Sequence, residues 1–158
     1  MKNKSEILAR RFEEVFLNGT WVANTNYQKA LTDLSFDQAI QKVSDLNTIY
    51  ALTYHIHYYV RGVLQVFQGG ELTIRDKFSF DLPTAPSEEA WIELRSILFE
   101  DAQKFARTVR NLSDEQLYEG FVKPEYGTVE RNIDGMIEHA YYHLGQISLI
   151  RKLILKSG

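Results

Sequence analysis

Apolar residues recur at intervals of three and four along four stretches of the chain, which predicts four amphipathic helices. The first helix is expected from Ser5 to about Leu17, and the second within residues 47–70, where Gly69 and Gly70 end it. The third follows Ser87, a favourable N-cap before two acidic residues, and ends near residue 112. The fourth is expected from about Thr128 to Lys156. Its apolar positions are Ile133, Met136, Ala140, His143, Ile147, Ile150 and Ile154.

The helical period disappears between the second and third of these helices. Residues 71–86 alternate roughly by two and contain Pro83 and Pro86, which predicts an extended loop that could include a strand pair. A shorter helix capped by Ser35 is expected in residues 35–43. With 158 residues, the chain is expected to form one domain, residues 1–158. The predicted fold class is all-α: a four-helix bundle with a long loop between the second and third main helices, and this loop could cross one end of the bundle.

Composition excludes several classes of protein. The net charge is −3, and lysine and arginine are scattered, so we expect no nucleic-acid partner, which would need clustered cations. The chain has no cysteine, so a metal would have to bind nitrogen and oxygen ligands. The sequence contains no secretory signal and no uninterrupted apolar run of about 18 residues. We therefore expect a cytoplasmic protein with no membrane partner.

The four histidines lie on only two of the predicted helices, which is the main chemical signal. His139 and His143 are four residues apart, so both side chains can reach one ion from the same helix face. A third ligand would come from the second helix, which carries His55 and His57. These two project about 200° apart around the helix, so at most one is expected to face the same ion. Periodicity leaves the choice between them open.

Three neutral imidazoles suit Zn²⁺, Ni²⁺ or Fe²⁺ and leave positions for water or substrate. Such an ion would act as a Lewis acid that lowers the pKa of a bound water or thiol. The alternative is that the histidines are polar residues at the edge of the core, bonded to tyrosines or carbonyls. The segment "HAYYH" also lacks the glutamate of a zincin helix.

Two stretches of the sequence resemble the DinB-like superfamily of metal-binding four-helix bundles: "LTYHIHYY", with its histidine–isoleucine pair, and "EHAYYHLGQI". The position of Trp21 after the first helix and the chain length agree with this resemblance, which covers nearly the whole chain at the level of architecture. It implies that His55, His139 and His143 are the metal ligands and gives His57 no role. Characterised relatives include bacillithiol S-transferases and mycothiol-dependent isomerases, and members are often homodimers.

The resemblance therefore implies a metal-dependent enzyme that performs hydrolysis or thiol transfer on a small-molecule substrate, with a divalent metal and a low-molecular-weight thiol as cofactors. Two alternatives stay open. One is a non-catalytic homodimeric binding or structural bundle, and the other is a metal-sequestering protein with a fourth protein ligand. Three further features have both a functional and a structural interpretation: Glu138 could orient a ligand histidine, Arg61 could hold an anionic group, and the 71–86 loop could be a lid.

Overall fold

The computed structural model describes residues 3–156, and this part of the chain is helical with no named strand. In chain order the elements are α1 (Lys4–Glu13), the π-helical turn η1 (Glu14–Asn18), α2 (Tyr27–Leu31), α3 (Phe36–Ile40), α4 (Ile49–Phe67), the 3₁₀ turn η2 (Asp76–Phe78), α5 (Glu88–Arg110), α6 (Asp114–Tyr118), the 3₁₀ turn η3 (Pro124–Tyr126) and α7 (Val129–Lys156). The all-α fold class predicted from the sequence is confirmed, and the long helices fall where the periodicity placed them.

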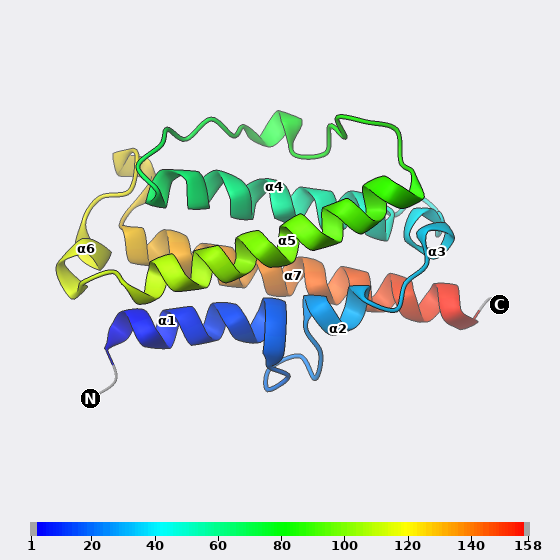
Figure 1. Ribbon diagram of the computed structural model, residues 1–158, viewed down its shortest axis with the longest axis horizontal. Helices are drawn as coiled ribbons and strands as arrows, with labels where there is room; N and C mark the ends of the chain where they lie inside the picture. Colours follow the sequence, from blue (N-terminus) through cyan, green and yellow to red (C-terminus); the bar gives the residue numbers. More distant parts are fainter. Residues whose placement is uncertain (1–2, 157–158) are drawn as a thin grey trace.

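The long helices α1, α4, α5 and α7 lie side by side in a bundle (Figure 1). α5 packs against α1 and α4, while α7 packs against α4 and α1. In Figure 1, α1 and α7 run from left to right, whereas α4 and α5 both run from right to left. Because α4 and α5 are parallel, the segment between them returns along the length of the bundle. It does not simply cross one end.

The ends of α4 and α5 follow the local signals in the sequence. The Ser87 hydroxyl accepts a hydrogen bond from the Ala90 amide at 3.1 Å, and the Thr48 hydroxyl accepts one from the Ala51 amide at 3.1 Å. At the other end of α4, Gly69 has φ of 88°, a left-handed conformation that glycine adopts without steric cost. The predicted cap at Ser87 and the stop at Gly69 are therefore confirmed.

The strand pair considered for residues 71–86 is wrong, because no ladder forms in this described segment. The alternation has another cause: Leu72 and Ile74 turn toward the helices while their neighbours are exposed. The Tyr58 hydroxyl accepts a hydrogen bond from the Arg75 amide at 2.8 Å and donates one to the Arg75 carbonyl at 3.1 Å. A tyrosine of α4 thus occupies the place that a partner strand would take.

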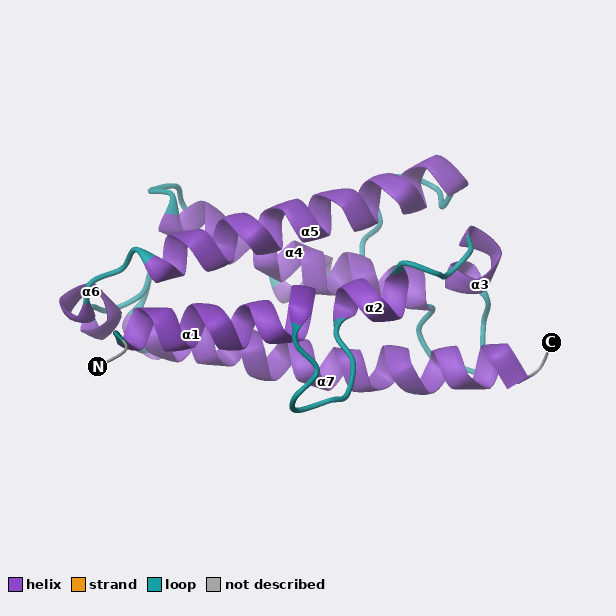
Figure 2. Cartoon of the chain, turned by 60° about the horizontal axis from the view of Figure 1, so that its bottom comes forward, coloured by secondary structure: helices purple, strands orange, loops and turns teal. Residues whose placement is uncertain are grey.

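Two short helices, α2 and α6, were not expected from the sequence. Each is only five residues long, so neither contains enough turns to show a helical period. α2 continues the line of α1 beyond an exposed loop (Figure 2). Its Tyr27 hydroxyl donates a hydrogen bond to the Ala140 carbonyl of α7 at 2.8 Å. The predicted Ser35 cap is confirmed at α3, where Ser35 and Gln38 form a capping box.

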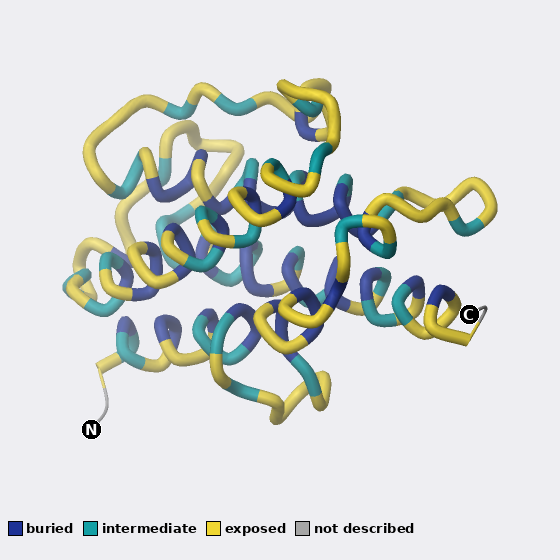
Figure 3. Tube along the Cα trace, turned by 45° about the vertical axis from the view of Figure 1, so that its right-hand side comes forward, coloured by how far each residue is buried: buried dark blue, intermediate teal, exposed yellow. Residues whose placement is uncertain are grey.

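The buried residues face the interior of the bundle, and the connecting segments carry most of the exposed ones (Figure 3). Aromatic rings hold α1 to α5: the Phe12 ring lies 4.2 Å from that of Phe105 and 4.5 Å from that of Phe16, measured between centroids. All the apolar positions predicted for the last helix are buried. No helix within residues 3–156 combines the length and hydrophobicity that a membrane span needs.

Candidate metal centre

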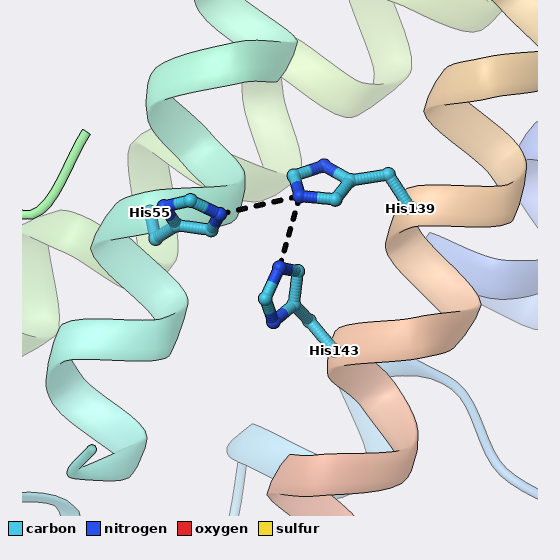
Figure 4. A group of neighbouring side chains, drawn as sticks. All are labelled: His55, His139 and His143. Atoms are coloured by element: carbon cyan, nitrogen blue, oxygen red, sulfur yellow. Dashed lines mark hydrogen bonds between the residues drawn. The ribbon is translucent and has the colours of Figure 1, made fainter. Parts of the chain in front are cut away.

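His55, His139 and His143 meet between α4 and α7. α4 contributes His55, and two consecutive turns of α7 contribute His139 and His143 (Figure 4). The helices bring them together because α4 and α7 pack against each other and because the four-residue spacing puts His139 and His143 on one face. His55 and His143 are buried, and His139 is half-buried.

The ring nitrogens of the three histidines converge. Nε2 of His139 lies 2.9 Å from Nε2 of His143 and 3.2 Å from Nε2 of His55. One ring nitrogen of each residue lies within 4.8 Å of the others. A neutral imidazole nitrogen is either one donor or one acceptor, so Nε2 of His139 cannot form good hydrogen bonds with both neighbours. Ligands around tetrahedral Zn²⁺ stand about 3.3 Å apart, given Zn–N bonds of about 2.0–2.1 Å, so this donor set fits a divalent ion.

Gln146 fixes the orientation and the tautomer of His143. Nδ1 of His143 lies 2.6 Å from the Gln146 side-chain oxygen, which accepts the hydrogen bond from the ring. The proton is therefore held on Nδ1, and Nε2 presents its lone pair to the other two histidines. Metal-binding histidines characteristically have such a partner on the nitrogen that does not face the ion.

Burial keeps the three histidines neutral near pH 7. It lowers the pKa of His55 to about 4, with repulsion from His143 adding to the effect. Burial likewise lowers the pKa of His139 to about 4, helped by His143 and His55. The pKa of His143 is also lowered by burial, although the hydrogen bond to Gln146 opposes the shift. Neutral imidazoles keep the lone pairs that a metal needs.

The 71–86 segment covers one side of the three histidines. The Phe80 ring stacks on that of His55 with a centroid distance of 4.1 Å. The Tyr59 ring contacts that of His139 edge-on at 5.0 Å, and the Tyr59 hydroxyl donates a hydrogen bond to Asp76 at 2.7 Å. Burial and this hydrogen bond raise the pKa of Tyr59 to about 12. The segment therefore supplies both an apolar cover and a carboxylate near the site.

A pocket of about 470 Å³ opens beside His139. Its wall combines apolar residues of α4, α7 and the 71–86 segment with Tyr59, Asp76, Arg131 and Asn132. A small molecule could reach the half-buried edge of the histidine cluster by this route. The pocket thus gives the candidate metal centre an opening and a set of polar groups with which to orient a ligand.

The structure places His57 away from this cluster. Its Nε2 lies 3.0 Å from a carboxylate oxygen of Asp101 on α5, and both side chains are largely buried. The sequence left open which histidine of α4 joins the pair on α7, and the structure brings His55 to it. Glu138 does not bond to a histidine, because its side chain is exposed and pairs with Arg131 at 3.0 Å.

Sequence reasoning missed three residues that surround the histidines. Gln146 could have been found, since it lies three residues after His143 on the same helix face. Asp76 and Asp101 could not, because they lie on elements whose placement against α4 does not follow from periodicity.

Comparison of the chain with protein-family models, with curated proteins and with solved structures finds no match.

Proposed function

We propose that this chain is a cytoplasmic, metal-dependent enzyme of the DinB-like superfamily, with a divalent metal on His55, His139 and His143. The observation that carries the proposal is the convergence of three neutral imidazole nitrogens, one of them held in the ligand tautomer by Gln146. A bound ion would act as a Lewis acid that lowers the pKa of a water or of a substrate thiol. Zn²⁺, Ni²⁺ and Fe²⁺ all suit such a set of ligands.

The site favours an enzyme over a metal-sequestering protein. Within residues 3–156, no carboxylate or fourth histidine joins the three converging ring nitrogens. The negative charge of Asp76 acts on both His55 and His139, but its carboxylate accepts a hydrogen bond from the Tyr59 hydroxyl at 2.7 Å. Open positions on the ion, next to a pocket, are what substrate binding requires.

The residues of the pocket would position the substrate. Arg131 and Asn132 can hold a polar or anionic group at the mouth, while Val63, Leu72 and Met136 exclude water from its apolar part. The hydroxyl proton of Tyr59 is already donated to Asp76, so Tyr59 would not donate a hydrogen bond to the substrate. Its ring would instead form a rigid part of the pocket wall beside His139. The reactions that we propose are hydrolysis of a small molecule or transfer of a low-molecular-weight thiol.

The likeness to the superfamily rests on the histidine-bearing stretches of α4 and α7. Trp21, which also contributed to the resemblance, is 87% exposed. We also propose that the chain forms a homodimer, because exposed apolar side chains such as Tyr142 and Leu149 lie on α7. Light scattering on the purified protein tests this by giving the mass in solution.

A thiol-consumption assay tests the enzymatic proposal. Metal-loaded protein would be incubated with monochlorobimane and with glutathione, bacillithiol, mycothiol or coenzyme A in turn, and with 4-nitrophenyl acetate to detect hydrolysis. We expect one of these reactions to depend on the metal and to be lost in His139→Ala. Stoichiometric metal binding without turnover of any of them would favour the non-catalytic binding protein.

A further inference from the structure

A second pocket lies on the opposite side of α4 from the three histidines. It has a volume of about 450 Å³ and is lined by residues of α4, α5 and the 71–86 segment. None of His55, His139 and His143 lines it, whereas His57 does. Two residues of one helix that are two positions apart project about 200° apart, which places this pocket and the candidate metal centre on different faces of α4.

The wall of this second pocket is mainly apolar and aromatic. α4 contributes the rings of Tyr50, Tyr54 and Tyr58, and the 71–86 segment contributes Leu82 and Pro83. Such a wall suits an organic molecule with an aromatic ring, since ring faces and edges pack favourably against tyrosine.

His57 lines this pocket and has a ring nitrogen that can accept a hydrogen bond. Because a carboxylate accepts, Nε2 of His57 carries the proton that it shares with Asp101, at 3.0 Å. Nδ1 then has a free lone pair. Within residues 3–156, the side-chain nitrogens that are both buried and without a hydrogen-bond partner belong to His55 and Arg95, so Nδ1 of His57 is not cut off from solvent. No other group in residues 3–156 hydrogen-bonds to it. A ligand with a hydroxyl group could therefore donate to Nδ1.

Arg61 places a cation one helical turn beyond His57. It lines the pocket, and no carboxylate of residues 3–156 pairs with it. Four other arginines do form ion pairs, namely Arg10, Arg11, Arg110 and Arg131. The four-residue spacing puts the Cβ atoms of His57 and Arg61 about 5–6 Å apart, so both can contact neighbouring groups of one small ligand.

Glu93 of α5 also lines the pocket, on the side of Tyr50, whose pKa its charge raises after the larger effect of burial. A second negative charge on the ligand would meet this carboxylate. The pocket thus favours a single anionic group at the Arg61 end and an uncharged body toward Tyr50.

We propose that this second pocket binds a small 2-hydroxycarboxylate with an aromatic group, independently of the metal centre. The carboxylate would pair with Arg61, the hydroxyl would donate to Nδ1 of His57, and the ring would lie among the tyrosines, Leu82 and Pro83. His57 and Asp101, which the candidate metal centre does not use, then have a ligand-binding role.

Calorimetric titration of the metal-free protein with 3-phenyllactate tests this proposal. Two matched probes separate the contacts: 3-phenylpropionate lacks the hydroxyl, and 1-phenyl-2-propanol lacks the carboxylate. We expect 3-phenyllactate to bind with one-to-one stoichiometry, with each probe at least about tenfold weaker, the factor expected for one lost charged or buried hydrogen bond.

Variants then locate the binding. Arg61→Gln should weaken 3-phenyllactate about tenfold but leave 1-phenyl-2-propanol unchanged, because only the carboxylate contact is lost. Arg107→Gln, which changes an exposed arginine of α5 outside the pocket, and His139→Ala should bind as the wild type does. The proposal is overturned if 3-phenyllactate does not saturate the protein, if removal of the hydroxyl has no effect, or if Arg61→Gln and Arg107→Gln behave alike.

Discussion

His55 and His57 lie two residues apart on α4 and face different neighbours: Nε2 of His55 contacts His139 of α7, while Nε2 of His57 contacts Asp101 of α5. α4 is the helix between α5 and α7, so its opposite faces pack on different helices. One histidine therefore belongs to the candidate metal centre, and the other joins α4 to α5.

This relationship predicts opposite phenotypes for the two positions. Replacement of His57 by leucine should leave the metal content unchanged but lower the free energy of unfolding by about 2 kcal/mol, because the largely buried Asp101 would keep only Lys104, a half-exposed cation at 3.4 Å, as a partner. Urea unfolding of the metal-free protein measures this cost. The double variant His57→Leu/Asp101→Leu should recover most of it, since the buried carboxylate is gone and the half-exposed Lys104 keeps its contact with water. A double variant no more stable than His57→Leu would contradict this assignment.

Gln146 should control metal affinity without binding the ion itself. Gln146→Leu removes the acceptor for Nδ1 of His143, so the ring can rotate or change tautomer. We expect a loss of metal affinity of about 10- to 100-fold, the range typical of residues that orient metal ligands. Competition with a chromogenic chelator measures the affinity, and Gln103→Leu, an exposed change on α5, is the matched control. Equal affinities for both variants would show that Gln146 does not orient the ligand.

The stability of the metal-free protein should fall as the pH is lowered from 6.5 to 4. Burial lowers the pKa of His55 and His139 from 6.5 to about 4, so between these values the unfolded chain binds more protons than the folded chain. The stabilisation is fully present above pH 6.5 and is lost as the pH approaches 4. Thermal melts with EDTA present measure this dependence. His139→Gln should show a shallower decline over the same range, and an unchanged slope would contradict the prediction.

Gly62 should be required for the close contact between α4 and the 71–86 segment. A Cβ atom at this position would lie 2.5 Å from Ile74 Cγ2. Ile74 lines both pockets, so its displacement should change both. For Gly62→Ala we expect a net destabilisation of about 1–2 kcal/mol, because overpacking exceeds the gain in helix propensity. Urea unfolding gives the stability, and faster hydrogen exchange at the Arg75 amide would report the displaced segment. A more stable variant with unchanged exchange would contradict the contact.

The sequence predicted the long helices because each contains several turns, and every turn repeats the apolar signal. It placed His139 and His143 on one face of one helix for the same reason. It could not choose between His55 and His57 from periodicity, because α4 is buried on both of those faces. Only the resemblance selected His55, and the structure brings that residue to the pair.

The hydrophobic periodicity could not predict which residues pair over long sequence distances or how the irregular segments are hydrogen-bonded. Asp101 is one acidic residue among many on an amphipathic helix, and its pairing with His57 depends on how α5 rotates against α4. The 71–86 segment alternates like a strand, yet a side chain, Tyr58, bonds to both backbone groups of Arg75, and other backbone groups of the segment bond within turns. Periodicity describes which side of a segment is buried, but not which partner satisfies its backbone.

Elemental analysis of the protein purified without a histidine tag tests the central claim most directly. The wild type would be measured beside the alanine variants of His55, His57, His139 and His143, each after reconstitution with Zn²⁺, Ni²⁺ or Fe²⁺. We predict about one metal ion per chain in the wild type and in His57→Ala, and loss of the ion in the other three variants. A wild type that holds none of these ions would contradict the metal centre. Metal retained in His55→Ala and lost in His57→Ala would show that the wrong histidine of α4 has been assigned.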